Sequence, residues 1–171
     1  MLQDFSLFIL PTLLIAAAVS DVMSLRIPNW LTLLIAILFF PMALAAHMPW
    51  LEFGSHVVAG VVLFFVGFAF FQIGIFGGGD AKLMAAAGLW FGTAKVLPFL
   101  FMTAFAGGIL ALCVAFWSAF MVSWEIDEDK WPFAEMGRKL RALGPNVPYG
   151  FAFALGGILA FKDTWWVNGL G

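Results

Sequence analysis

The sequence has very few charged residues. Asp, Glu, Lys and Arg make up 11% of the 171 residues, whereas about 25% is typical of soluble domains. Hydrophobic residues make up 64%, so too few polar side chains remain to cover a soluble globule of this size. The composition therefore excludes both a soluble globular domain and a disordered chain, and it predicts a membrane protein. A net charge of −2 without a basic cluster also argues against a nucleic-acid partner.

Cysteine and histidine are almost absent. Cys113 is the only cysteine, which excludes an intrachain disulfide and a CxxC metal site, and we expect it to be a small buried apolar side chain. His47 and His56 are both assigned to the loop after the second apolar run, and no HExxH motif is present. A zinc peptidase is therefore unsupported, and GxSxG and P-loop motifs are missing as well. We expect no metal ion and no organic cofactor.

Long apolar runs dominate what is present. Six of them, at about 5–20, 30–46, 57–75, 83–91, 96–122 and 147–161, predict an all-α polytopic membrane protein with six transmembrane helices in a single domain, 1–171. The fourth run is too short to cross the hydrocarbon core by itself. The first run is expected to be a retained helix, because Asp4 stands where a signal peptide has basic residues. Gly60, Gly67 and Gly74 recur every seventh residue, which predicts a face for close helix packing.

Basic residues predict the orientation in the membrane. Six alternating crossings put most of them on one side, which the positive-inside rule makes cytoplasmic: Arg26, Lys82, Lys130, Arg138, Lys139 and Arg141. Lys95 and Lys162 fall on the other side, where both chain termini are also expected. The long cytoplasmic loop, 123–146, is expected to include a short amphipathic surface helix. Its acidic residues are Glu125, Asp127, Glu128 and Asp129.

Two aspartates are the candidates for chemistry. Asp21 follows the first apolar run and Asp80 precedes the fourth, so the topology places both at cytoplasmic helix ends, where they could meet in one cleft. Neighbouring carboxylates share a proton, so one can activate water while the other protonates a carbonyl oxygen or a leaving amine. Alternatively, Asp80 is only a helix cap and Asp21 a solvated loop residue, or the pair binds a cation or relays protons in a small transporter.

The residues around the aspartates have roles of their own. The glycines before Asp80 are Gly77, Gly78 and Gly79. They are expected to permit positive φ and to let a substrate backbone approach the carboxylate. Lys82 could tune the pair or bind a lipid headgroup. Pro28 disfavours helix at Ile27, so the first helix must end there and hold Asp21 at its end.

Three motifs together resemble one known family. DVMSLRIPN from Asp21 to Asn29, GGGDAKL from Gly77 to Leu83 and VPYG from Val147 to Gly150 are similar to motifs of the type IV prepilin peptidases, the GxGD aspartic peptidases of the bacterial inner membrane. The resemblance covers nearly the whole chain. It implies that Asp21 and Asp80 are catalytic, with Ile27, Pro28 and Asn29 as supporting motif residues. It also implies that the substrate is a prepilin whose basic leader is cut on the cytoplasmic side.

Departures from the larger family members suggest a subtype. Those members carry a CxxC zinc-binding insertion after the first helix and also N-methylate the new terminus. Here a short link, Val22 to Asn29, joins the first two runs, and a single cysteine remains. We therefore expect a peptidase without methyltransferase activity, similar to those that serve Flp/Tad pili. The acidic run 125–129 could attract the basic leader, and a GxGD protease with other membrane substrates is a further alternative. Nothing in the sequence indicates the oligomeric state.

Overall fold

The computed structural model describes residues 2–123 and 149–168, and within these ranges the chain forms helices joined by short connections. The helices are α1 (Leu2–Ser24), α2 (Asn29–Ala45), α3 (Trp50–Gln72), α4 (Gly78–Ser123), α6 (Tyr149–Phe161) and α7 (Trp165–Asn168). The described residues contain no strand, so the predicted all-α class is confirmed. Nearly all of the loop 123–146, with its acidic run and predicted surface helix, lies outside the described residues.

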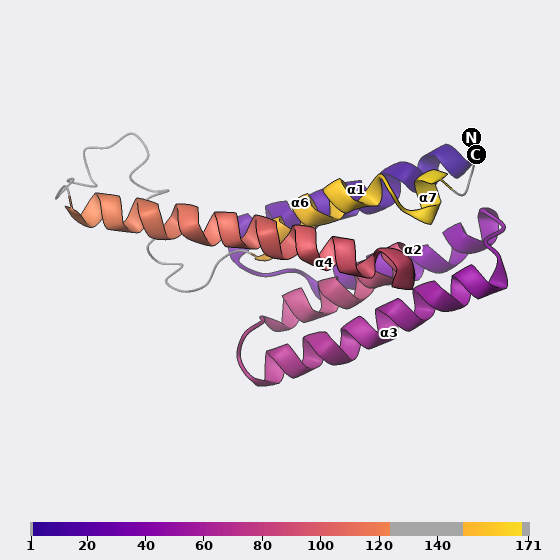
Figure 1. Ribbon diagram of the computed structural model, residues 1–171, viewed down its shortest axis with the longest axis horizontal. Coiled ribbons are helices and arrows are strands. Elements are labelled where there is room, and N and C mark those ends of the chain that lie inside the picture. The colour runs from indigo at the N-terminus through magenta and orange to yellow at the C-terminus, as the bar shows by residue number, and fades with distance from the viewer. Residues whose placement is uncertain (1, 124–148, 169–171) are drawn as a thin grey trace.

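Helix α4 is the central element of the bundle. Its first half packs against α3 and its second half against α6, while α2 also contacts it. Helix α1 lies beside α6, and the start of α1 lies at the same end of the molecule as α7 (Figure 1). Large apolar side chains fill the interior, among them Leu14, Phe39 and Trp90, each 0% exposed. Others point outward, including Leu51 at 90% and Phe116 at 73% exposed, as expected of helices surrounded by lipid.

Three helical segments are long and apolar enough to cross a membrane. They are Leu7–Ser24, Trp50–Gln72 and Gly78–Trp117, and α2 is a shorter apolar helix. The predicted runs 83–91 and 96–122 are both parts of α4, which leaves the helical conformation at one residue, Gly92, and not over the predicted loop 92–95. Helix α3 begins at Trp50, earlier than predicted, because Pro49 precedes its first turn in an extended conformation.

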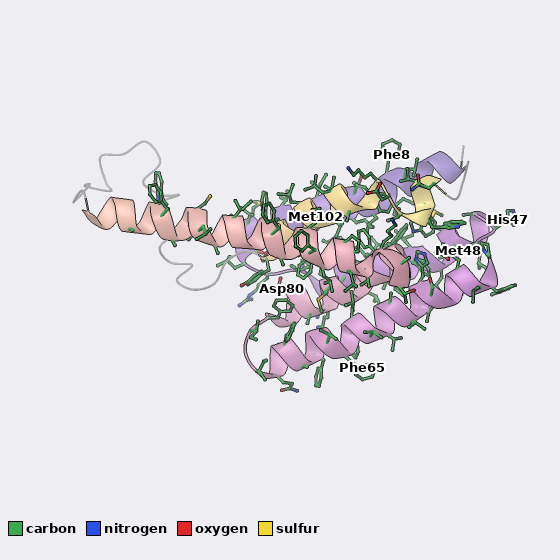
Figure 2. The ribbon with its side chains drawn as sticks, in the orientation of Figure 1. Phe8, His47, Met48, Phe65, Asp80 and Met102 are labelled. Carbon is green, nitrogen blue, oxygen red and sulfur yellow. The ribbon has the colours of Figure 1, made fainter. Side chains whose placement is uncertain are left out.

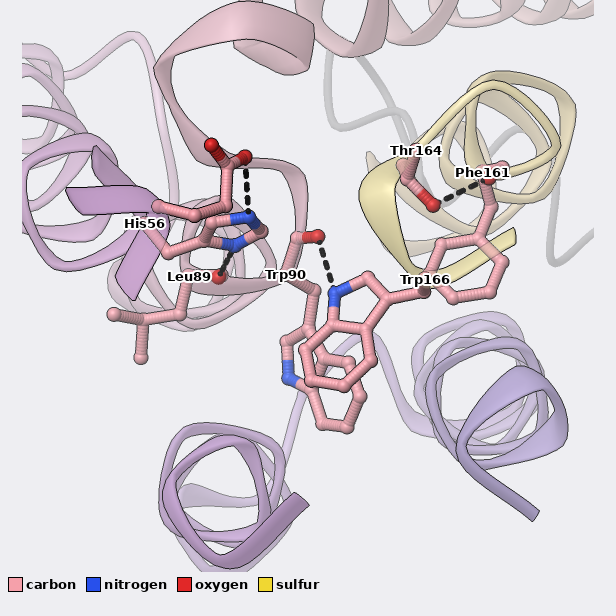
Figure 3. A network of polar contacts seen from close by, with 7 residues as sticks. His56, Leu89, Trp90, Phe161, Thr164 and Trp166 are labelled. Atoms are coloured by element: carbon pink, nitrogen blue, oxygen red, sulfur yellow. Dashed lines mark hydrogen bonds and ion pairs between the residues drawn. The ribbon is translucent and has the colours of Figure 1, made fainter. Parts of the chain in front are cut away.

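The break at Gly92 divides α4 into halves 78–91 and 93–123. Gly92 has φ 63 and ψ 174, a conformation that is essentially restricted to glycine. The last carbonyls of the first half therefore lose their helical partners, and side chains replace these partners (Figure 3). His56 Nδ1 donates to the Leu89 carbonyl at 2.6 Å, and Trp166 Nε1 donates to the Trp90 carbonyl at 2.9 Å. These bonds join α3 and α7 to the break.

The loop predicted to hold both histidines contains only one of them. His47 does lie in the connection after α2, but His56 lies inside α3 and is 0% exposed. The second ring nitrogen of His56, Nε2, faces Glu52 Oε1 at 3.5 Å. His56 is therefore part of the helix packing, and the polar residues that suggested a loop are the first turns of α3.

Glycines bring α3 close to the first half of α4. A Cβ atom at Gly60 would lie 2.5 Å from Leu89 Cδ2, and one at Gly67 would lie 3.1 Å from the Ala81 carbonyl oxygen. Two of the three predicted packing glycines therefore serve that purpose. The prediction is wrong for Gly74, which follows α3 with φ +75 and has no neighbour within 4 Å of a built Cβ.

The second half of α4 continues past the end of α6. Gly107 contacts the ring of Tyr149, the first residue of α6. From there, α4 extends beyond the described ends of α1 and α3 (Figure 1). Cys113 lies on this extension and is exposed, so the prediction that it is buried is wrong.

Candidate active site

Asp21 lies in the last turn of α1 and is almost buried, at 6% exposed. Its Oδ2 accepts a hydrogen bond of 2.7 Å from the backbone N–H of Gly150, the second residue of α6. Unpaired N–H groups and a partial positive charge make the start of a helix a favourable place for a carboxylate. Asp21 is therefore held between two helices, which excludes the alternative that it is a solvated loop residue.

Asp80 is the third residue of α4. The Gly77 backbone N–H donates a hydrogen bond to its carboxylate, and the Ala81 N–H donates to the Gly77 carbonyl at 3.1 Å. This resembles a capping box, in which a side chain in the first turn reaches back to the residue before the helix. Figure 2 shows Asp80 at the end of the bundle opposite to His47.

The two carboxylates lie close enough to interact. The charge on Asp21 acts on Asp80, although they come from α1 and α4 and are far apart in the sequence. Each is bonded by a backbone N–H at the start of a helix, α6 for Asp21 and α4 for Asp80. Backbone N–H groups at helix N-termini thus stabilise a negative charge at this site, while repulsion between the two carboxylates favours one proton for the pair.

The segment after Asp21 is attached to the helix that carries Asp80. Ile27 is 7% exposed, and a Cβ at Gly79 would lie 3.2 Å from the Ile27 Cβ. Asn29 begins α2, and its Oδ1 accepts a hydrogen bond of 2.8 Å from Lys82 Nζ. These two contacts explain physically why the motif residues Ile27 and Asn29 occur together with a glycine and a lysine on either side of Asp80.

Pro28 ends the connection between α1 and α2. It precedes α2 with φ −62 and ψ 137, and its missing N–H suits the residue before a helix. The chain turns at Leu25, where φ is +53, and the Arg26 carbonyl accepts a hydrogen bond of 2.9 Å from Ser20 Oγ. The predicted end of the first helix near Asp21 is therefore correct within a few residues.

The glycine run before Asp80 is used for close packing. The described glycines with positive φ are Gly74 and Gly92, so the expectation that Gly77, Gly78 or Gly79 adopts positive φ is wrong. A Cβ at Gly77 would lie 3.0 Å from Asp80 Oδ2, and one at Gly78 would lie 3.5 Å from the Phe71 ring. A side chain would therefore be crowded at Gly77 by the carboxylate and at Gly79 by Ile27, whereas the contact at Gly78 is an ordinary one.

Other candidate residues do not join this site within the described part of the chain. The acidic run of Glu125, Asp127, Glu128 and Asp129 lies outside it. Residues 2–123 and 149–168 contain no group of three or more His, Cys, Asp or Glu side chains that could hold a metal ion.

Gly150 is the site residue whose function the sequence analysis missed. A Cβ at this position would lie 2.8 Å from both Cβ and Oδ2 of Asp21, so only glycine leaves room for the carboxylate. The sequence feature that could have identified Gly150 is the VPYG motif. This motif contributed to the family resemblance, but nothing in it indicated a contact with Asp21. Since Tyr149 and Gly150 begin α6, that motif brings a helix N-terminus to Asp21.

Comparison with known proteins gives one match. No curated protein and no solved structure matches the chain significantly. A sequence model described as the type IV leader peptidase family matches residues 8–112, which include both aspartates and more than half of the chain. The protein therefore belongs to the type IV leader peptidase family and is a membrane protease.

Proposed function

We propose that the protein is an aspartic endopeptidase in which Asp21 and Asp80 are the catalytic pair. The observation that carries the proposal is that the two carboxylates come from α1 and α4 to within range of each other's charge, and each accepts a hydrogen bond from a backbone N–H at the start of a helix. The hydrolysis needs one carboxylate in its charged form and one in its acid form, which repulsion between two neighbouring negative charges favours.

The mechanism uses one water molecule and no cofactor. The charged carboxylate takes a proton from the water as the water oxygen attacks the scissile carbonyl carbon. The acid form gives its proton to the carbonyl oxygen, which produces a tetrahedral diol. As the C–N bond breaks, the carboxyl that took the proton from water gives it to the leaving nitrogen, and the other carboxylate takes a proton from a diol hydroxyl. The products are a carboxylic acid and an amine, and the pair returns to its starting protonation. The backbone N–H groups of Gly77 and Gly150 keep both carboxylates in place through these transfers.

The proposed substrate is a prepilin, with cleavage between its basic leader and its hydrophobic helix. The family match to leader peptidases supports this substrate class. The connection between α1 and α2 runs only from Leu25 to Pro28, which leaves no inserted domain there and supports the short Flp/Tad type without methyltransferase activity. The acidic run 125–129 is proposed to attract the basic leader.

The proposed location is the bacterial inner membrane, with the aspartates on the cytoplasmic side. Helices α1, α2 and α3, both halves of α4, and α6 make six crossings in this topology. It places Arg26 and Lys82 at the cytoplasmic end, near the aspartates, and Lys95 and Lys162 at the other end with both termini. The agreement of this charge pattern with the end at which Asp21 and Asp80 meet supports the assignment.

The proposal is tested by leader cleavage in membranes. The chain is co-expressed with a Flp-type prepilin, and loss of the leader is followed by gel mobility. Asp21→Asn and Asp80→Asn keep the size of each side chain but remove the acid, and each is expected to abolish processing. Asp163→Asn changes an exposed aspartate at the end of α6 and serves as the matched control, with processing at the wild-type rate.

Persistent processing in either single variant would show that the two-aspartate mechanism is wrong. If the wild type cleaves no prepilin but carries an ion flux that depends on both carboxylates, the transporter alternative applies. Cleavage of other membrane proteins, with the same dependence on both aspartates, would keep the chemistry and change the substrate.

A further inference from the structure

An open apolar groove lies on the side of the bundle away from α1 and α6. It has a volume of about 730 Å³ and runs between α2, α3 and the first half of α4. Leu33 and Ala36 of α2, Val61 and Phe64 of α3, and Ala85 of α4 line it. Rings of α2 and α3 contact each other where Phe39 and Phe40 meet Phe53, so the groove lies between helices that are joined at one end.

One end of the groove is polar and positively charged. Lys82 lies there, and its ammonium donates to Asn29 Oδ1 at 2.8 Å. An ammonium has three N–H donors, so two are left over, and no acidic side chain in the described ranges lies within 4.0 Å of it. The nearby hydroxyl of Thr32 is already bonded to the Asn29 carbonyl at 3.0 Å. Within the part of the chain that the structure describes, Lys82 is thus a positive charge without an ion-pair partner at one end of the apolar groove.

The length of the groove matches one leaflet. Its lining residues on α2 run from Asn29 to Phe40, which is about 16 Å at the helical rise of 1.5 Å per residue. The hydrocarbon core is about 30 Å thick, and a transmembrane helix needs roughly 20 residues to cross it. A partner helix would therefore require a groove about twice as long. Trp30, 64% exposed at the same end, is placed as interfacial tryptophans are.

We propose that this groove binds one anionic glycerophospholipid from the leaflet on the side of the aspartates. The phosphate accepts hydrogen bonds from the free donors of Lys82, and one acyl chain lies along Ala36 and Val61. The positive end selects an anionic headgroup because it supplies the missing counterion, and the apolar walls take the chain without sequence-specific contacts. The proposal is independent of the catalytic role of the aspartates.

Lipid retention by the intact protein tests the proposal. The full chain is purified in a mild detergent, and bound lipid is counted by native mass spectrometry after addition of phosphatidylglycerol or of phosphatidylcholine with the same chains. The wild type is expected to keep one phosphatidylglycerol. Lys82→Gln is expected to weaken its retention about fivefold, the effect of one lysine at an anionic headgroup. Retention of phosphatidylcholine should not change.

Two further variants make the test specific. Lys162→Gln removes an exposed charge at the other end of the bundle and is the matched control, with unchanged lipid retention. Ala36→Phe fills the groove and should reduce retention of both lipids, and thermal unfolding of each variant shows whether it is folded. Equal phosphatidylglycerol retention by folded Lys82→Gln and wild type would overturn the proposal. A photocrosslinker at Ala36 that captures a protein segment in native membranes, and no lipid, would also overturn it.

Discussion

Replacing Gly150 with alanine should damage catalysis far more than stability. The added Cβ would lie 2.8 Å from Asp21 Oδ2 and Cβ, whereas non-bonded carbon atoms prefer about 3.5–4.0 Å. Asp21 is 6% exposed, so its side chain has little open surface toward which it can move. Either the carboxylate or the start of α6 must shift by about 0.7 Å to restore an ordinary contact.

A shift of this size acts directly on the reacting group. A misplacement of about 1 Å costs about 100-fold in rate, which corresponds to about 2.7 kcal/mol of transition-state stabilisation. The hydrogen bond from Gly150 to Asp21 is weakened as well. We expect Gly150→Ala to lower kcat/KM for leader removal about 100-fold, measured as initial rates in membranes that contain equal amounts of each variant.

Two glycine variants separate this effect from general destabilisation. Gly108→Ala adds a methyl group where nothing lies within 4 Å, and it should leave the rate unchanged. Gly60→Ala lies on α3, outside the aspartate site, but would meet the Leu89 side chain at 2.5 Å, so it should lower stability by about 1–3 kcal/mol and leave the catalytic rate of folded protein nearly intact. Wild-type cleavage by folded Gly150→Ala would refute the reasoning, as would an equal rate loss in folded Gly60→Ala.

Other predictions concern the opposite end of the bundle and the connection after α1. Gly92→Ala should destabilise the protein by about 1–3 kcal/mol from backbone strain alone. A clash adds to this, because the new Cβ would lie 2.9 Å from the His56 ring. Thermal unfolding measures the loss, and an unchanged melting temperature would contradict the prediction. Trp166→Phe leaves the buried Trp90 carbonyl without its side-chain donor and should cost about 1–3 kcal/mol by the same measurement, with wild-type stability as the contrary result. Ile27→Ala should lower the free energy of unfolding by about 2–5 kcal/mol, because Ile27 is buried. It should also slow leader cleavage, because Ile27 packs against Gly79 beside Asp80. Full activity of the folded variant would contradict that role of Ile27.

The aspartate pair could be located from the sequence because local signals end the helices there. Pro28 and the glycines before Asp80 interrupt apolar runs, and two helix ends on the same side of a bilayer are at the same depth. The contact of Gly150 with Asp21 could not be predicted in this way. It depends on how α6 lies against α1, and nothing in the local sequence reports the distance between two helices.

The errors have the same physical origin. His56 stands among polar residues, which suggested a loop, but its ring replaces a lost helical partner of Leu89 on another helix. Gly74 fits the spacing of Gly60 and Gly67, yet α3 ends before it. Cys113 lies in an apolar run, but that part of α4 extends beyond the described ends of α1 and α3, so its side chain is exposed. For His56 and Cys113 the arrangement of other helices decided the outcome, and for Gly74 the end of α3 did.

The extension of α4 has a practical consequence for experiments. Because Cys113 is the only cysteine of the chain and is exposed on this extension, a maleimide reagent can attach one spin label or fluorophore per molecule without any engineered mutation. A nitroxide at this thiol reports its immersion depth through its accessibility to oxygen and to water-soluble relaxation agents. A fluorophore there, paired with a labelled prepilin leader, converts substrate arrival beside the aspartates into an optical signal that can be followed in real time.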